Sequence, residues 1–380
     1  MIFYFDNAAT TRIKPEVLKA MMPYLTEEYG NPSSLYALGR RTKKAIDTAR
    51  MQVASLINCD KNEIYFTGCG SESDNTALKG VASSYKHKGN HIITSKIEHH
   101  AILESCETLE KQGFKVTYLN VDKEGVIKLQ ELENAITDKT ILISIMFANN
   151  EIGTIQPVKQ ISKIAKERNI VFHTDAVQAA GNVPIDVKEM GIDMLSISGH
   201  KIYAPKGVGA LYVKKGIDFD KFMNGGHQEK NKRAGTENLS GIVGFGKACE
   251  LAKKSLSAHM NYLQELRDYY IEKVFENIQN VRINGTVEHR LPGNCNISFL
   301  GVDSTALLLE LDKKGICCSA GSACNSGESS PSHVLKAIGL DDETSNSALR
   351  VTFGEFNTKL EVDYLVQNLK ECVERLRKGC

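Results

Sequence analysis

One lysine in this sequence of 380 residues stands where a side chain could do chemistry. Lys201 ends the polar stretch Ser198–Lys201, which follows the apolar run Met194–Ile197 and precedes the glycine-rich segment 205–209. In an open α/β sheet, ligands bind beyond the carboxyl ends of the strands, so a lysine there can point its amine into a cleft. We hypothesise that Lys201 carries a covalently bound aldehyde cofactor. The alternative is a solvated loop lysine, one of 47 lysines and arginines.

Three more expected strands also lead into polar residues, at His99, Asn149–Glu151 and Asp175–Gln178. Buried polar side chains cost free energy unless they are paired, so a group of them at one edge implies a ligand. Pyridoxal 5′-phosphate would use such a set, because its aldehyde takes a lysine, its ring nitrogen an acid, its phenolate oxygen amide donors and its face a stacked ring. Taken singly, Asp175 could be a helix cap and His99 an ordinary loop histidine.

The segment Gly68–Ser71 precedes an expected helix and could bind the phosphate of such a cofactor. Glycine lets the backbone approach an anion, and the free N–H groups and dipole of a helix N-terminus favour negative charge. The alternative is a plain tight turn, since a short glycine-rich turn is weakly specific.

A cysteine in a stretch of small and polar residues is the candidate nucleophile. Cys324 lies in the segment 318–331, which is rich in serine and glycine and is expected to be a loop. Such a segment buries little surface, so it should open at low cost and let a cysteine travel. The alternative is an exposed thiol in an idle loop.

The elements that must position these residues alternate between strand and helix. The expected strands are 63–67, 91–95, 115–119, 140–147, 170–174 and 194–198, and the helices between them include 71–85, one ending at 111, and 158–168. This alternation predicts a mostly parallel sheet covered by helices on both faces.

Beyond about residue 239 the pattern changes to a smaller α+β arrangement. A long helix is expected over 240–278, a strand over 294–299, and helices over 304–313 and 360–378. We predict a large cofactor-binding domain over 14–256 and a small domain of 1–13 and 257–380, which carries the Cys324 loop.

The composition is that of an ordinary globular protein, with 42% hydrophobic and 24% charged residues. A formal net charge of +1 argues against a nucleic-acid or membrane-surface protein. We find no secretory signal or membrane span and expect a cytoplasmic protein, whose ten cysteines stay reduced. We predict no metal site, because zinc-type C-x-x-C pairs are absent and the adjacent Cys317 and Cys318 suit tetrahedral chelation with Cys324 poorly.

Several motifs, in order along nearly the whole chain, resemble those of the cysteine desulfurases of the class V aminotransferase superfamily, of the nitrogen-fixation and iron–sulfur-cluster type. The motifs are Phe5–Thr11, Gly30–Ser34, Asn149–Gly153, His173–Gln178, Ser198–Lys201, Arg233–Thr236 and Gly321–Cys324. The resemblance implies the pyridoxal-phosphate-dependent fold type I, whose large domain has a mostly parallel seven-stranded sheet.

The resemblance also implies a role for each residue of the site. Lys201 would form the Schiff base with the cofactor, Asp175 would pair with the pyridinium nitrogen, and His99 would stack on the ring. Asn150 and Gln178 would contact the ring oxygen and its neighbourhood. Four residues would hold the phosphate: Gly70, Ser71, Ser198 and His200. Thr236 would reach the phosphate of the other subunit in a homodimer.

The implied reaction converts L-cysteine to L-alanine and leaves the sulfur on Cys324 as a persulfide. Lys201 would remove the Cα proton, and His99 would help with protons at the substrate thiol. Arg350, with Asn31 beside it, would bind the substrate carboxylate; without the resemblance, Arg350 could be an ordinary ion-pair residue. The sulfur would pass to a protein acceptor, either an iron–sulfur scaffold or a tRNA-thiolation enzyme, and direct contact with nucleic acid or membrane is not expected.

Two other functions remain open on the sequence. A selenocysteine lyase, or another pyridoxal-phosphate lyase or aminotransferase, could use the same scaffold, although transamination needs no mobile cysteine. A non-enzymatic sulfur-relay partner would not need Lys201, Asp175 and His99.

The chain departs from the family pattern at five positions. Gly68 and Cys69 replace the usual serine and glycine, Ser71 a threonine, Tyr36 a histidine, and Ala204 a common glycine. Gly70 and Ser71 still offer a backbone amide and a hydroxyl for the phosphate, whereas the effect of Tyr36 on selectivity or docking stays open.

Overall fold

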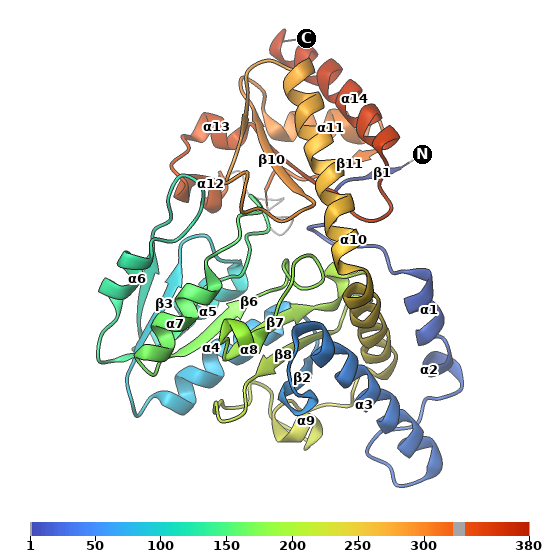
Figure 1. Ribbon diagram of the computed structural model, residues 1–380, viewed down its shortest axis with the longest axis vertical. Helices are drawn as coiled ribbons and strands as arrows, with labels where there is room; N and C mark the ends of the chain where they lie inside the picture. Colours follow the sequence, from blue (N-terminus) through green and yellow to red (C-terminus); the bar gives the residue numbers. More distant parts are fainter. Residues whose placement is uncertain (1, 322–330, 380) are drawn as a thin grey trace.

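A seven-stranded sheet forms the centre of the larger part of the molecule, in a computed structural model that describes residues 2–321 and 331–379 (Figure 1). The strand order is β2-β8-β7-β6-β5-β3-β4, and neighbours are parallel except at β8, which is antiparallel to β2 and β7. The strands are β2 (Ile64–Thr67), β3 (His91–Ser95), β4 (Lys115–Leu119), β5 (Thr140–Ser144), β6 (Val171–Asp175), β7 (Met194–Ser198) and β8 (Gly209–Val213). The prediction of a mostly parallel seven-stranded sheet is confirmed.

The strand β8 is the one whose position the sequence did not indicate. It begins at Gly209, directly after a glycine-rich segment that reads as a loop, and all five of its residues are buried. A Cβ on Gly209 would lie 2.7 Å from the carbonyl oxygen of Ile197 on β7, so the close approach of the two strands requires glycine there. The expected strand 140–147 is also shorter in the structure and ends at Ser144.

Helices cover both faces of this sheet, because alternate strand residues enter two different apolar clusters. Ile143, Phe172 and Leu195 pack in one cluster with residues of α3, α7 and α10. Their neighbours Leu142, Val171 and Met194 pack in the other with residues of α4 and α5. The helices of this part are α1 (Pro15–Met21), α2 (Pro23–Thr26), α3 (Ala37–Ile57), α4 (Gly70–Tyr85), α5 (His100–Lys111), α6 (Leu129–Ala135), α7 (Val158–Glu167), α8 (Val187–Met190) and α9 (Gln228–Asn231), with two short 3-10 helices at Lys61–Glu63 and Gly199–Lys201.

The 39-residue helix α10 (Leu239–Asn277) connects this part to a second, smaller core at the top of Figure 1. Its buried residues up to Cys249 lie in the first core, against which Leu251, Ala252 and Met260 also pack, and those from Leu263 onward contribute to the second. The change of core thus falls between Met260 and Leu263, shortly after the expected domain boundary at 256/257, and the division itself stays a prediction.

The smaller part holds a three-stranded antiparallel sheet of order β12-β10-β9 and a two-stranded parallel pair of β1 with β11. Its elements are β1 (Phe3–Tyr4), β9 (Val281–Ile283), β10 (Asn294–Phe299), α11 (Ser304–Asp312), β11 (Ile316–Cys317), α12 (His333–Ala337), α13 (Asp342–Asn346), β12 (Ala348–Thr352) and α14 (Lys359–Arg377). Pairing of β1 with β11 brings the N-terminal residues into this part, and Phe5 is fully buried in its core.

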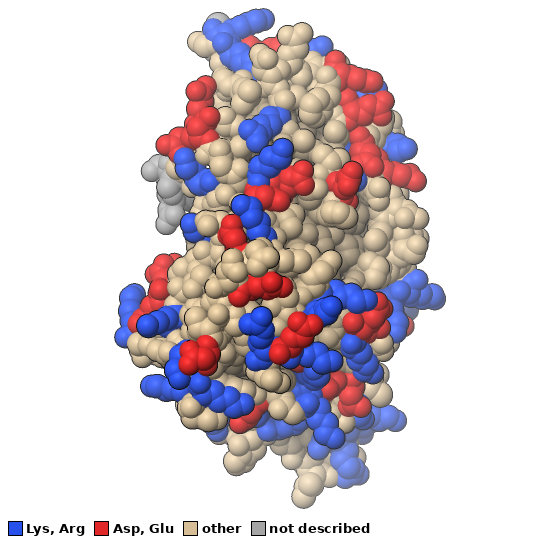
Figure 2. Space-filling model, turned by 60° about the vertical axis from the view of Figure 1, so that its left-hand side comes forward, with Lys and Arg blue, Asp and Glu red and all other residues tan. Residues whose placement is uncertain are grey.

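Lys and Arg side chains are interspersed with Asp and Glu over the face shown in Figure 2, as the formal net charge of +1 suggests. In the described part of the chain, no helix is both long and apolar enough to cross a membrane.

Candidate active site

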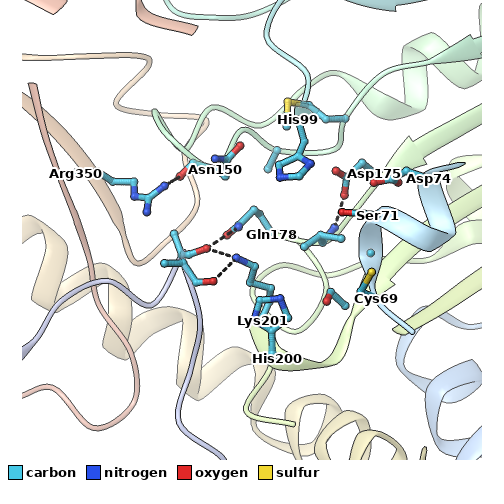
Figure 3. Close-up of a pocket in the computed structure, with 17 residues that line it drawn as sticks. Cys69, Ser71, Asp74, His99, Asn150, Asp175, Gln178, His200, Lys201 and Arg350 are labelled. Atoms are coloured by element: carbon cyan, nitrogen blue, oxygen red, sulfur yellow. Dashed lines mark hydrogen bonds between the residues drawn. The ribbon is translucent and has the colours of Figure 1, made fainter. Parts of the chain in front are cut away.

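A pocket opens at the carboxyl ends of β6 and β7, where residues from distant parts of the chain meet (Figure 3). It brings together ten of the predicted site residues: Gly70, Ser71, His99, Asn150, Asp175, Gln178, Ser198, His200, Lys201 and Arg350. The pocket is also lined by Ala8, Ala9, Cys69, Asp74, Met146, Ala148 and Val177. The topology explains this gathering, because parallel strands present their carboxyl ends at one edge of the sheet.

Lys201 lies in a short turn directly after β7, and its side chain enters the pocket instead of bulk solvent. Its amine donates hydrogen bonds to the carbonyl oxygens of Ala8 and, at 2.7 Å, of Ala9. Both carbonyls come from the N-terminal segment, which therefore completes the pocket from the side opposite the sheet. The amine is thus held by two backbone carbonyls that line the same pocket.

Two buried carboxyl groups, Asp175 at the end of β6 and Asp74 on α4, lie next to one another at the pocket wall (Figure 3). The carboxylate of Asp175 accepts a hydrogen bond from the amide of Val177 at 2.8 Å. Burial raises the pKa of Asp175 to about 6, and it raises the pKa of Asp74 well above its usual value, to which the negative charge of Asp175 adds. The amide of Val177 and the positive charge of Lys201 stabilise the ionised form of Asp175, whereas one oxygen of Asp74 has no hydrogen-bond partner among the described residues. The proton of the pair therefore lies on Asp74, and Asp175 is the carboxylate available to a cationic group.

His99 enters the pocket from the start of α5 and is neutral at physiological pH. Burial, together with the positive charge of the nearby Lys201, lowers the pKa of its imidazole to about 4. Its Nδ1 accepts a hydrogen bond from the amide of Ala101 at 3.1 Å. The ring proton therefore lies on Nε2, which gives His99 one donor for the pocket and a flat face for a ligand.

The N-terminus of α4 forms the end of the pocket suited to an anion. Gly70 is the first residue of this 16-residue helix, and the thiol of Cys69 caps it by accepting a hydrogen bond from the amide of Glu72. A Cβ on Gly70 would lie 2.7 Å from Cγ2 of Val177, so glycine allows the close packing there. The buried Ser198 hydroxyl has no hydrogen-bond partner among the described residues and lines the same pocket. A phosphate group fits this set of donors.

Arg350 on β12 supplies the positive charge on the opposite side of the pocket. Its side chain is 1% exposed and forms an ion pair with Asp6, with 2.8 Å between Nη2 and Oδ1. Its Nη1 donates to the carbonyl oxygen of Asn150 at 3.3 Å, whereas its Nε has no partner in the part of the chain that the structure describes. Arg350 is thus both an ion-pair residue and a pocket residue, two interpretations that the sequence treats as alternatives.

Two of the predicted site residues that the structure describes lie elsewhere. Asn31 and Thr236 are exposed and do not line the pocket. Thr236 lines a separate surface cleft with Arg233, which is paired with Glu72 of α4. Cys324 lies outside the residues that the structure describes. Tyr36, whose effect on selectivity or docking stays open, is 58% exposed and does not line the pocket either.

The sequence analysis assigned no role to three features of the site: the carbonyls of Ala8 and Ala9, the carboxyl group of Asp74, and the thiol cap of Cys69. For Asp74 a signal existed, because this acid is spaced with Ala77, Leu78 and Val81 on the buried face of α4. Every residue has a backbone carbonyl, so the types and spacing of side chains could not identify the roles of Ala8 and Ala9.

The class-V aminotransferase family matches residues 3–365. The cysteine desulfurase IscS of Clostridium botulinum (strain Hall) is 53% identical over 377 residues, which cover 99% of this chain and 95% of the relative. The cysteine desulfurase IscS of Methanosarcina thermophila is also 53% identical and covers 98% of this chain and 92% of its own. A solved NifS-like protein has a TM-score of 0.93 at 38% identity and covers 99% of this chain and 100% of its own.

The chain therefore belongs to the class-V aminotransferase family of pyridoxal-phosphate-dependent enzymes. Within that family, the full-length relatives named above are cysteine desulfurases.

Proposed function

We propose that the pocket at Lys201 performs the cysteine desulfurase reaction of this enzyme, the conversion of L-cysteine to L-alanine with transfer of sulfur to Cys324. The observation that carries the proposal is the meeting of Lys201, Asp175 and His99 with Arg350 in one pocket. These groups supply an amine, an anion, a neutral imidazole and a carboxylate-binding cation, which the reaction needs together.

Bound pyridoxal phosphate supplies an electron sink for the charge that develops at the substrate Cα. The pocket fits this cofactor, since the N-terminus of α4 and the unpartnered Ser198 hydroxyl suit its phosphate and Asp175 suits a protonated ring nitrogen. His200, whose Nδ1 lies 3.1 Å from the hydroxyl of Thr10, would close the phosphate end. Gln178, which donates to the carbonyl of Ala8 at 3.1 Å, and Asn150 would bind near the ring oxygen.

Different residues perform the proton transfers and the sulfur transfer. The amine of Lys201 takes the proton from the substrate Cα and returns a proton to the carbon skeleton. The thiolate of Cys324 attacks the substrate sulfur, the C–S bond breaks with its electron pair leaving on carbon, and that carbon is protonated to give alanine. His99 is neutral with its proton on Nε2, so it can exchange a proton with the substrate thiol.

Arg350 would bind the substrate carboxylate. Its unpartnered Nε and its place at the pocket wall support this role, because a buried guanidinium recognises a carboxylate through directed N–H groups. We also propose that Asn31 assists from the loop before α3. Its side-chain oxygen accepts a hydrogen bond from the amide of Ser33 within its own loop. A contact of Asn31 with the substrate would therefore form only in the assembled enzyme.

We further propose a homodimer in which Thr236 reaches the phosphate bound by the other subunit. Its exposure and its place in a separate cleft, outside the pocket that the other phosphate residues line, support a contact made between chains. The sulfur acceptor would be a protein, either an iron–sulfur scaffold or a tRNA-thiolation enzyme. A cytoplasmic location is supported by the eight described cysteines, none of which forms a disulfide.

The test compares wild-type protein with Cys324→Ser and Lys201→Ala. With L-cysteine, the wild type should yield alanine and a persulfide that mass spectrometry locates on Cys324. The serine variant should still change the cofactor spectrum on binding L-cysteine but form no persulfide, and the alanine variant should do neither. Wild-type yields from Cys324→Ser would place the nucleophile elsewhere.

A selenocysteine lyase is distinguished by running L-selenocysteine beside L-cysteine. The proposal expects turnover of L-cysteine with persulfide formation. Release of selenium from L-selenocysteine with no product from L-cysteine would favour the lyase instead.

A further inference from the structure

The carboxylate of Asp6 contacts two functional parts of the molecule at once. Its Oδ1 accepts a hydrogen bond from Nη2 of Arg350 at 2.8 Å. Its Oδ2 accepts one from the hydroxyl of Ser319, also at 2.8 Å. Each oxygen therefore has its own partner, one in the substrate pocket and one on the chain that continues to Cys324, which follows Ser319 by five residues (324 − 319).

The backbone around Asp6 is fixed by three segments that are far apart in sequence. Ser319 and Arg350 form a β-bridge with hydrogen bonds in both directions, and Asp6 is bridged to Thr352 on the same strand β12. Because this frame holds all three side chains in register, the carboxylate cannot leave one partner without disturbing the other.

Arg350 depends on this carboxylate for its charge balance. The guanidinium is 1% exposed, and Asp6 is the acidic group paired with it among the described residues. A substrate carboxylate that approaches the guanidinium meets a cation already paired with an anion, so Asp6 and the substrate compete for the same positive charge.

We propose that Asp6 is a positioning residue that links recognition of the substrate carboxylate at Arg350 to the placement of the chain leading into the Cys324 segment. When a carboxylate pairs with Arg350, the interaction of Asp6 with Arg350 weakens, and its second oxygen transmits the change to Ser319. The inference rests on the function proposed for the pocket and adds a residue to which that function gave no role.

The first test replaces Asp6 by asparagine, which keeps an oxygen for Arg350 but removes the competing charge. The affinity for L-alanine, the product of the proposed reaction, which has a carboxylate and no thiol, is measured in the holoenzyme from the cofactor spectrum. Charge-assisted hydrogen bonds are roughly twice as strong as neutral ones, so Asp6→Asn should bind L-alanine about fivefold more tightly. It should also form the Cys324 persulfide more slowly in a single turnover, because Ser319 loses its charged acceptor.

This opposite change in binding and rate is a signature that a loss of structure would not give, since misfolding weakens both. Cysteamine, which has an amine and a thiol but no carboxylate, is the matched ligand, and its affinity should be the same in Asp6→Asn and wild type. Asp303→Asn is the matched protein control, because it removes an exposed carboxylate that caps α11 in the same part of the molecule. It should match the wild type in every measurement.

Ser319→Ala tests the second contact independently. It should leave the L-alanine affinity unchanged and lower the single-turnover rate of persulfide formation severalfold. A wild-type rate in Ser319→Ala, or equally weakened binding of L-alanine and cysteamine in Asp6→Asn, would overturn the inference. A wild-type protein that forms no persulfide on Cys324 would instead refute the proposed function, so the two failures are distinguishable.

Discussion

The two sides of the active-site pocket are built in different ways. The cofactor side, defined here as Asp175, Ser198 and Lys201, lies at the ends of β6 and β7, in which every residue is buried. The substrate side, defined as Asp6, Ser319 and Arg350, joins the N-terminal segment to two segments near the end of the chain. The cofactor side is thus part of the largest core, whereas the substrate side is held by β-bridges and side-chain contacts between segments that are distant in sequence.

This difference suggests that the two sides of the pocket have different tasks in the reaction. A group that must stay in place through every step is held best by strands buried on both faces. A group that must exchange one partner for another needs polar contacts that can be remade, as the ion pair of Arg350 with Asp6 can. Changes on the cofactor side should therefore affect the chemical step, and changes on the substrate side should affect binding.

The largest effect is expected on the cofactor side, from Asp175→Asn. The amide cannot supply the negative charge that stabilises a protonated ring nitrogen, so turnover should fall about 100-fold or more. The matched control is Asp74→Asn. Burial raises the pKa of Asp74 well above its usual value, so asparagine resembles the protonated acid already present and should preserve most activity.

Steady-state kinetics and the absorbance of the bound cofactor measure both variants. Equal losses in the two would show that the roles of the two buried acids are assigned wrongly. Near-normal turnover in Asp175→Asn would remove the main support for the cofactor side.

A smaller effect is expected on the substrate side, from Arg350→Lys. Lysine keeps the charge but loses the planar set of N–H groups, so KM for L-cysteine should rise about 10- to 100-fold, as for the loss of a charge-assisted hydrogen bond. The cofactor spectrum without substrate should stay that of the wild type. A loss of bound cofactor in this variant would contradict the separation of the two sides.

The smallest effect concerns stability and comes from Glu98, a buried acid beside the cofactor side. Its carboxylate accepts hydrogen bonds from the hydroxyl of Ser95 at 2.6 Å and the amide of Met146 at 3.0 Å. Burial nevertheless raises the pKa of Glu98 from 4.5 to about 8. The folded protein therefore retains this proton between these two pH values while the unfolded chain loses it, and stability falls as the pH rises through that window.

Glu98→Gln should remove this contribution, on the order of 1–3 kcal/mol between pH 5 and pH 8. Chemical unfolding of the cofactor-free protein at the two pH values measures it. Glu104→Gln, an exposed carboxylate on helix α5, which begins two residues after Glu98, is the control and should leave the pH dependence unchanged. An unaltered pH dependence in Glu98→Gln would mean that Glu98 is ionised throughout.

Most of the fold could be predicted from the sequence, because its signals are local and periodic. The helix α7 shows this, since Val158, Ile161 and Ala165 recur at helical spacing and form its buried face. The long helix α10 was expected over 240–278 and spans Leu239–Asn277. The strand β8 was not predicted, because the need for glycine at its first residue, Gly209, arises only from the close approach of the neighbouring strand β7.

For the site, the sequence indicated which residues line the pocket but not which contacts hold them in place. Ten of the predicted residues line one pocket, because the carboxyl ends of β6 and β7 face the same space. The carbonyls that hold the amine of Lys201 belong to Ala8 and Ala9, whose side chains carry no chemical signal. Their part in the site depends on the folded path of the backbone.

The sequence by itself determined the family, the type of sheet and the candidate chemical groups, since each is encoded in residue types, spacing and order along the chain. Only the tertiary structure decided which of two buried acids keeps its proton and that Arg350 is paired with Asp6, whose other oxygen meets Ser319. The physical reason is that pKa shifts and ion pairs depend on burial and distance between groups, and segments 344 residues apart (350 − 6) acquire a distance only when the chain folds.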